Sequence, residues 1–242
     1  MRTFIQLIKI CSITTVLLFS LSSQAGVISG YKWGNPTLGT QGGEVTWSLM
    51  DNGISCLGAF EPTPCTTSTL SSFMPTGFMT EIEKAFSLWS SIADITFKMV
   101  TDGGEPFGST PGADIRIAGH EIDGPSKDLA HAYYPEGFNH SGDIHFDIAE
   151  AWSIDKSTFF DVYSVAVHEI GHAIGLGHSS NRSAVMHEIY KGAISDLHAD
   201  DIATVLAIYG PSKIQASVPE PSSLILFMSM IGLVLVNQRK KS

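Results

Sequence analysis

The sequence is poor in basic residues. Its 242 residues include 14 Lys and Arg against 24 Asp and Glu, which gives a net charge of -10 at pH 7. Few of the basic residues lie in the middle of the chain, and no basic stripe of the kind that binds nucleic acid is present. We therefore expect no nucleic-acid partner, and we expect some of the acidic residues to serve cations instead.

Cysteine is also scarce, with three residues in the chain. Cys11 lies in an N-terminal segment that we expect to be removed, which leaves Cys56 and Cys65 as a pair. In an exported protein these two residues are expected to form a disulfide. The alternative interpretation is two free thiols, because the sequence does not give the distance between the two Cα atoms.

No apolar run reaches the roughly 20 residues that a membrane-spanning helix needs. At the N-terminus, Arg2 and Lys9 precede the short apolar run 13–21, and Ser23-Gln24-Ala25 follows it. This order is typical of a secretory signal peptide over residues 1–25, with the mature chain beginning near Gly26. An uncleaved anchor is the alternative.

At the C-terminus, too, the apolar run is shorter than a membrane-spanning helix needs. A polar linker, 212–221, leads to the apolar run 224–236 and then to a basic end at Arg239, Lys240 and Lys241. The segment either spans a membrane with help from its flanks or acts as a sorting signal that is read and removed. In either case the basic end is expected to stay cytoplasmic.

What the sequence does contain is a concentrated group of metal ligands at residues 168–178, His-Glu-Ile-Gly-His-Ala-Ile-Gly-Leu-Gly-His. On a helix, His168 and His172 are one turn apart on the same face, with Glu169 beside them. Gly175 lets the backbone leave the helix, so that His178 can supply a third ligand. Three protein ligands and one open position are typical of a catalytic zinc site.

The chemistry expected of this site is peptide-bond hydrolysis. Zinc would lower the pKa of a bound water to about neutrality, and Glu169 would take the water's proton as the general base. The alternative, a helix with incidental histidines, does not account for the whole pattern.

Hydrophobic periodicity predicts one domain over residues 26–211. Strands are expected at 44–49, 95–99 and around Ile115 and Ile117, in one sheet. Helices are expected at 80–91, at 157–176 and after a cap at Ser195 or Asp196, the last one ending at Gly210-Pro211. Residues 51–76, rich in Gly, Pro, Ser and Thr, are predicted to be a loop insertion.

The stretch from His120 to Trp152 is polar for the middle of a domain and rich in imidazoles and carboxylates. Imidazoles suit zinc, and carboxylates in a glycine-containing loop suit calcium. Composition alone leaves open a solvated acidic loop whose histidines have no role. His140, His187 and His198 are expected to be surface residues.

Taken together, these motifs resemble the matrixins, the metzincin branch that contains the matrix metalloproteases. The zinc motif is followed by Ser179, and Ser183-Ala184-Val185-Met186 is similar to the Met-turn that lies beneath the zinc, with Tyr190 after it. The resemblance covers most of 45–210. It implies an α+β fold with a twisted mixed sheet, about three helices and an active-site cleft, and a zinc endopeptidase acting on protein or peptide substrates.

The middle stretch resembles the metal loop of that family. The resemblance implies that His131 and His145 bind a structural zinc, with His120 as third ligand, and that Asp123, Asp147 and Glu150 bind calcium. The family's aspartate near the first histidine is missing; Glu121 replaces it, or the zinc site is incomplete. Asp143 matches a ligand of a second calcium ion. The cysteine-switch motif of the family propeptide is not found before the domain.

The C-terminal Val218-Pro219-Glu220-Pro221, the apolar run and the basic tail together resemble a PEP-CTERM sorting signal over residues 218–242. The resemblance implies an exosortase-like partner and delivery to the envelope, surface or extracellular matrix of a Gram-negative bacterium. A plain membrane anchor is the alternative. A non-proteolytic surface or matrix binding protein on the same scaffold remains the competing function.

Overall fold

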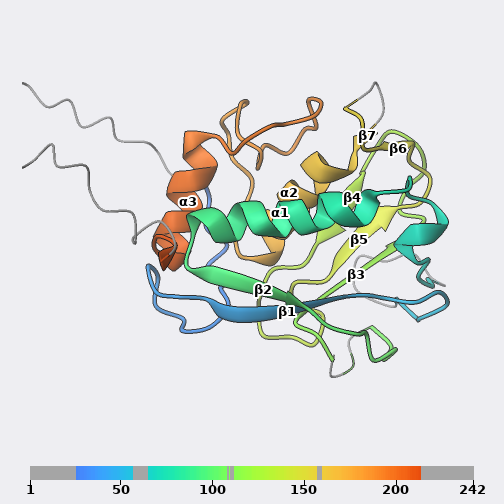
Figure 1. Ribbon diagram of the computed structural model, residues 1–242, viewed down its shortest axis with the longest axis horizontal. Helices are drawn as coiled ribbons and strands as arrows, with labels where there is room; N and C mark the ends of the chain where they lie inside the picture. Colours follow the sequence, from blue (N-terminus) through green and yellow to red (C-terminus); the bar gives the residue numbers. More distant parts are fainter. Residues whose placement is uncertain (1–25, 57–64, 108, 110–111, 157–159, 214–242) are drawn as a thin grey trace, which may run out of the picture.

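The computed structural model describes residues 26–56, 65–107, 109, 112–156 and 160–213 (Figure 1). The expected signal peptide, the sorting signal and all but the first two residues of the linker lie outside the described residues. Within them, no helix is both long enough and apolar enough to cross a membrane. The elements in chain order are β1 (Gly43–Leu49), the 3-10 turn η1 (Leu70–Ser72), α1 (Phe78–Ile92), β2 (Ile95–Met99), β3 (Ile115–His120), β4 (Ala130–Ala132), β5 (Ile144–Asp147), β6 (Trp152–Ser153), β7 (Phe160–Asp161), α2 (Val162–Ala173) and α3 (Ala199–Tyr209).

The main sheet has five strands in the order β2-β1-β3-β5-β4. The first four strands are parallel, and β4 alone runs antiparallel, against β5. Strands β6 and β7 form a separate two-stranded ladder. The α+β fold with a mixed sheet and three helices is thus confirmed, and so is the prediction that the strands at 44–49, 95–99 and 115–117 share one sheet.

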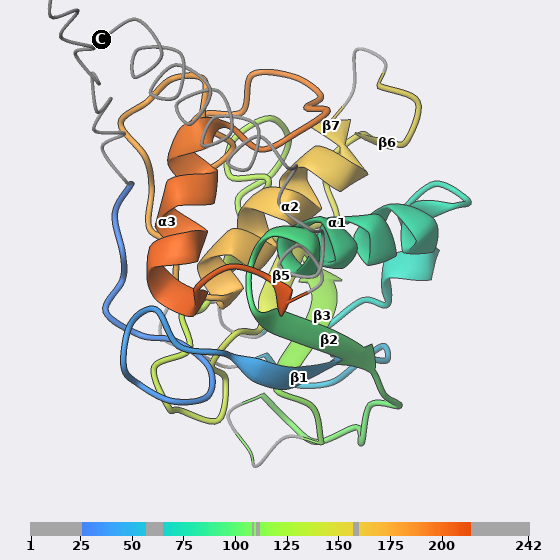
Figure 2. The same cartoon turned by 60° about the vertical axis from the view of Figure 1, so that its left-hand side comes forward.

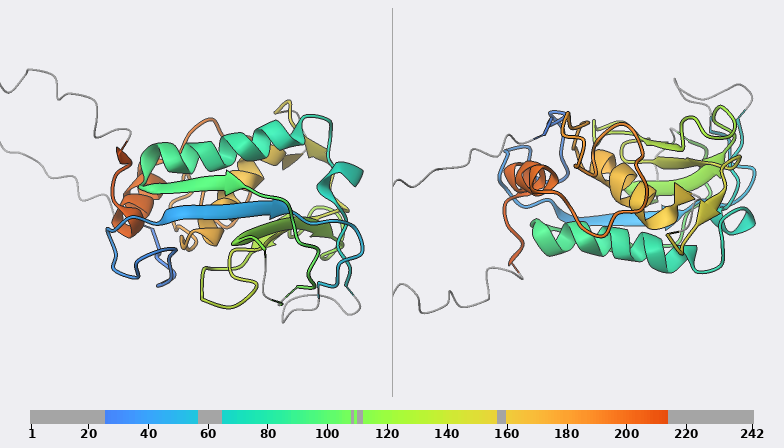
Figure 3. Two further views of the ribbon diagram at one scale, coloured as in Figure 1. Left: turned by 60° about the horizontal axis from the view of Figure 1, so that its bottom comes forward. Right: turned by 90° about the horizontal axis from the view of Figure 1, so that it is seen from above.

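Helices α1 and α2 lie on one face of the sheet, and α3 lies at the end of the molecule opposite β6 and β7 (Figure 2, Figure 3). The predicted apolar stripe of α1, Ile82, Ala85, Phe86 and Trp89, is buried. The indole of Trp89 also donates a hydrogen bond to the carbonyl of Val167, at 3.0 Å, inside the core. This bond fixes α2 against α1, and therefore fixes the helix that carries the first two histidines of the zinc motif.

Helix α2 begins later than the sequence suggested. The prediction of a helix from Ser157 is wrong, because Phe160 and Asp161 form β7, paired with Trp152 and Ser153 of β6. Asp161 is then the N-cap, its carboxylate accepting from the backbone N–H of Ser164 at 2.9 Å. A helix start is favoured where a short polar side chain satisfies the first free N–H groups.

Two other boundaries also differ from the predictions. Helix α3 is capped by His198 and not by Ser195 or Asp196, and Asp201 completes a capping box. His198 is therefore not an idle surface residue. The predicted loop 51–76 is partly ordered against the core, since Leu70 is fully buried and Ser68 exchanges backbone hydrogen bonds with Gly119 of β3.

Candidate active site

Three imidazoles converge at the end of α2. The Nε2 atom of His172 lies 3.0 Å from that of His168 and 3.1 Å from that of His178. Tetrahedral ligands about 2.05 Å from a zinc ion would be separated by about 3.3 Å. Both separations are therefore close to what one shared zinc ion requires.

The outer ring nitrogens show which way these imidazoles are oriented. Nδ1 of His168 lies 2.7 Å from the carbonyl oxygen of Val185, and Nδ1 of His172 lies 2.8 Å from that of Leu176. A carbonyl accepts but does not donate, so each Nδ1 carries the proton and each Nε2 presents a lone pair. Lone pairs that face one another at this distance repel unless a cation lies between them.

Burial keeps these rings neutral. It lowers the pKa of His168 to about 4 and the pKa of His172 to about 3, and it also lowers the pKa of His178. Neutral imidazole is the form that binds zinc. At neutral pH all three ligands are therefore ready for a metal ion.

Glu169 is the carboxyl group beside this cluster. It is 5% exposed, and its Oε2 atom has no hydrogen-bond partner among the described residues. Burial, with a smaller contribution from Asp128, raises the pKa of Glu169 to about 8. A buried carboxyl without a hydrogen-bond partner among the described residues, next to three converging imidazoles, fits a site built for a cation.

Two glycines shape the backbone around the cluster. Gly175 has φ +102°, and a Cβ there would collide with a backbone carbonyl of the N-terminal segment. A Cβ at Gly171, inside α2, would collide with Sδ of Met186. Met186 is 1% exposed, so the residue expected at the Met-turn packs directly against the helix of the zinc motif.

Asp201 of α3 holds the Met-turn in place, a role that sequence reasoning missed. Its carboxylate accepts from the backbone N–H groups of Val185 and Met186, at 2.9 and 3.1 Å, and of His198. Because Val185 in turn offers its carbonyl to His168, α3 reaches the first ligand through two hydrogen bonds. The only sequence signal for this role was an acidic residue in the first turn of a helix.

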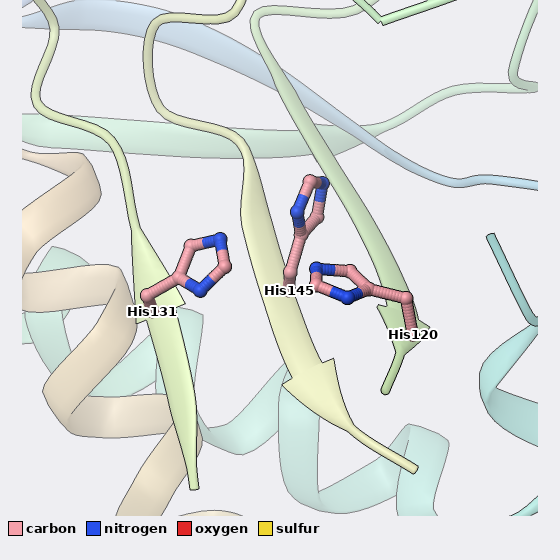
Figure 4. A group of neighbouring side chains, drawn as sticks. All are labelled: His120, His131 and His145. Carbon is pink, nitrogen blue, oxygen red and sulfur yellow. The ribbon is translucent and has the colours of Figure 1, made fainter. Parts of the chain in front are cut away.

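A second histidine cluster lies on three neighbouring strands (Figure 4). His120 comes from β3, His145 from β5 and His131 from β4, and their ligating nitrogens all lie within 4.8 Å of one another. Among the described residues, this cluster and His168, His172 and His178 are the two groups of three such ligands. The strand order therefore brings together the three histidines that the resemblance assigned to one zinc ion.

The surroundings of this second cluster are aromatic. Phe107 lies 5.4 Å from the ring of His145 and 5.3 Å from that of His140, measured between ring centroids. Tyr133 contacts His140 and His131. His140, expected to be a surface residue, is thus half-buried in an aromatic group beside the cluster.

The three expected calcium ligands lie around one loop. Asp147 accepts from the backbone N–H groups of Asp123 and Ala149, and Glu150 accepts from that of Ser126. Burial raises the pKa of Glu150, and the charges of Asp147 and Asp123 raise it further. The carboxylates therefore act on one another electrostatically, as acidic groups that share a cation site do.

Asp143 has a different environment, which sequence reasoning did not foresee. It accepts from the backbone N–H of Arg116 at 3.0 Å, and burial raises its pKa well above the usual value while the charge of Arg116 opposes that rise. The guanidinium of Arg116 forms two hydrogen bonds with Asp102, at 2.8 and 2.7 Å. A buried cation of the chain itself thus lies near the expected ligand of a second calcium ion.

Cys56 and Cys65 are joined by a disulfide in the structure, with a Cα–Cα distance of 5.1 Å. Both residues are buried. The bridge closes a loop of the segment that precedes η1, on the β1–α1 connection.

Comparison with known proteins agrees with this geometry. The family model described as Matrixin matches residues 66–210. The chain is similar to interstitial collagenase of Sus scrofa, with 40% identity over 151 residues, 57% of this chain and 30% of the relative. It is also similar to matrix metalloproteinase-19 of Mus musculus (36% identity, 62% of this chain, 28% of the relative) and to metalloendoproteinase 1-MMP of Arabidopsis thaliana (39%, 55% and 38%). The chain thus spans about a third of the length of these relatives.

Proposed function

This chain belongs to the matrixin family of zinc metalloendopeptidases, and we propose that it hydrolyses internal peptide bonds of exported or environmental proteins at the site of His168, His172 and His178. The observation that carries the proposal is the convergence of three imidazole rings, two of them oriented by hydrogen bonds from Nδ1 to backbone carbonyls, beside the buried carboxyl of Glu169.

The residues of the site have separate roles in this reaction. His168, His172 and His178 would hold zinc, which supplies a Lewis acid that activates water and polarises the scissile carbonyl. Glu169 accepts the proton of the attacking water and passes it to the amine that leaves. A zinc ion held by the adjacent histidines would lower the pKa of Glu169 from the raised value that burial gives it, and would so favour the carboxylate form that acts as the base.

The edge of the sheet offers a place for the substrate chain. Strand β4 pairs with β5 on one side, and among the described strands it has no partner on the other side. It also packs against α2, which carries His168 and His172. An extended peptide that adds to this edge by backbone hydrogen bonds would lie beside the histidines.

We further propose that bound ions brace the site. His120, His131 and His145 would hold a structural zinc, and Asp123, Asp147 and Glu150 would hold calcium. The converging nitrogens of the first set and the mutual charge effects of the second support these assignments. Loss of these ions would disturb β4 and β5, and therefore the edge strand along which the substrate is proposed to bind.

The location of the enzyme is also a proposal. Residues 1–25 would direct export, and residues 218–242 would be recognised by an exosortase-like enzyme, with transient or anchored membrane association at the envelope, surface or matrix. The signal-peptide pattern and the Pro-Glu-Pro motif with its apolar run and basic tail support this proposal.

The test is hydrolysis of an unfolded protein substrate by the purified chain, before and after a zinc chelator and after zinc is restored. We expect cleavage that chelation abolishes and zinc recovers. Zinc bound at the site without cleavage of any member of a broad peptide library would contradict the proposal and favour the non-proteolytic binding protein.

A further inference from the structure

Tyr134 is an aromatic side chain next to the zinc motif and is not one of the expected metal ligands. Its ring stands at 88° to the ring of His172, with 5.6 Å between the centroids. It lies two residues beyond β4, the edge strand along which the substrate is proposed to bind.

The alternation of the strand explains why this side chain faces α2. Pairing with the β5 side continues past β4, because Tyr133 donates to Asp143 and accepts from Gly142 through its backbone. In an extended strand successive side chains point to opposite faces. His131 and Tyr133 face the second histidine cluster, so Ala132 and Tyr134 point the other way, where Tyr134 meets His172.

The hydroxyl of Tyr134 is available to a ligand. The side chain is half-buried, and no described residue forms a hydrogen bond with its hydroxyl. A phenol has an O–H group that can donate a hydrogen bond.

We propose that Tyr134 is a substrate-contacting residue, whose ring forms a wall of the peptide site beside His172 and whose hydroxyl donates a hydrogen bond to a peptide carbonyl of the bound substrate. This inference rests on the proposed peptidase function. An extended peptide beside β4 presents carbonyl oxygens at regular intervals, and the hydroxyl of Tyr134, which no described residue engages, is a donor where that edge meets the zinc motif.

The experiment compares the full chain with its Tyr134→Phe variant, which keeps the ring against His172 and removes only the hydroxyl. We expect kcat/KM for a peptide that the wild-type chain cleaves to fall about five- to tenfold, as for loss of one hydrogen bond. Introducing Glu169→Ala into both chains allows the affinity for the same uncleaved peptide to be measured, and it should fall by a similar factor. Tyr31→Phe, at a 45% exposed tyrosine, is the matched control and should change neither value.

Zinc content and thermal stability of Tyr134→Phe should equal those of the wild-type chain. Peptide affinity within twofold of the control would overturn the inference, whatever happens to the rate. If the wild-type chain cleaves no peptide, the proposed function fails; if it cleaves and Tyr134→Phe binds normally, only the inference fails.

Discussion

At the scale of single residues, the structure holds two clusters of three histidines, each next to a buried carboxyl group. In each cluster three ligating nitrogens lie within 4.8 Å of one another, and a buried carboxyl oxygen without a hydrogen-bond partner among the described residues is close in sequence to each: Oε2 of Glu169 and Oδ2 of Asp143. The two clusters share no residue, so each can be tested by its own substitution.

Zinc content tests both clusters. We expect about two zinc ions per chain in the wild-type protein, and about one after either His172→Asn or His131→Asn, because each variant leaves one cluster with two ligands. Metal analysis of the purified, dialysed chains makes the measurement. His187→Asn, outside both clusters, should keep both ions; an unchanged zinc content in His131→Asn would exclude the second site.

The pH dependence of stability reports on Glu169. In the metal-free chain its pKa is about 8, against 4.5 when unfolded. Between these values the folded state binds the proton and the unfolded state does not, so unfolding becomes easier as pH rises. We expect the wild-type chain to lose stability relative to Glu169→Gln from about pH 4.5 to about pH 8, and no further above it.

Urea unfolding of the two metal-free chains across this range measures the difference. Both chains contain the same histidines, so the comparison isolates the change at Glu169. Glu83→Gln, an exposed change on α1, should differ from the wild type by an amount that does not depend on pH. The same flat result for Glu169→Gln would show that the carboxyl is solvated.

At the scale of elements, the close approach of α2 and the Met-turn is the central contact. Replacing a helical glycine by alanine ordinarily stabilises a protein, by about 1 kcal/mol. We expect the opposite sign for Gly171→Ala, a loss of about 1 to 3 kcal/mol, because the new methyl group overlaps Met186. Thermal or urea unfolding gives the sign directly.

The double variant with Met186→Ala is the control for that prediction. If the overlap is the cause, the two changes are coupled, and the double variant is more stable than the sum of the single losses allows. Additive losses, or a stabilised Gly171→Ala, would show that the helix and the Met-turn are farther apart than the structure places them.

The elements also show where sequence reasoning succeeds. The apolar stripe of α1 and the period-two strands were predictable, since burial repeats with the period of each element. The start of α2 was not, because Phe160 and Asp161 pair with β6, a contact that local periodicity does not register. The cap by His198 was missed because histidine is not a usual N-cap residue. In the structure His198 forms a capping box with Asp201.

For the site, the spacing in the sequence identified the metal ligands that lie on one helix and on the turn after it. His168 and His172 are one helical turn apart, and the glycine after the helix allows His178 to join them. Spacing could not identify residues whose neighbours depend on the order of the strands. Tyr134 could be identified only once β4 was known to be an edge strand facing α2. Asp201, far along the chain from the Met-turn it binds, gave no local signal.

At the scale of the whole molecule, the N-terminal segment and α3 both form hydrogen bonds with the end of α2. The indole of Trp33 donates to the carbonyl of Ala173 at 2.8 Å, and the hydroxyl of Tyr209 donates to that of Ile174 at 2.8 Å. The backbone N–H of Gly26 donates to the hydroxyl of Thr204 on α3 at 2.6 Å. Residues near the expected cleavage point are therefore part of the folded domain.

If residues 1–25 are a signal peptide, the exported protein begins at Gly26. We expect N-terminal sequencing or intact-mass analysis of protein recovered from the envelope or medium of an exporting bacterial host to give that residue, because small residues precede it. Ala25→Arg should block the cleavage. An exported chain that still begins at Met1 would favour the uncleaved anchor.

Glu169 gives the most direct test of peptide hydrolysis at the site of His168, His172 and His178. The measurement is the rate of peptide hydrolysis by the zinc-loaded Glu169→Ala chain, compared with the wild-type chain and with Glu83→Gln. We expect loss of at least about a hundredfold in kcat for Glu169→Ala, the usual contribution of a general base, with zinc content unchanged and Glu83→Gln fully active. Equal rates for Glu169→Ala and the wild-type chain would contradict the mechanism.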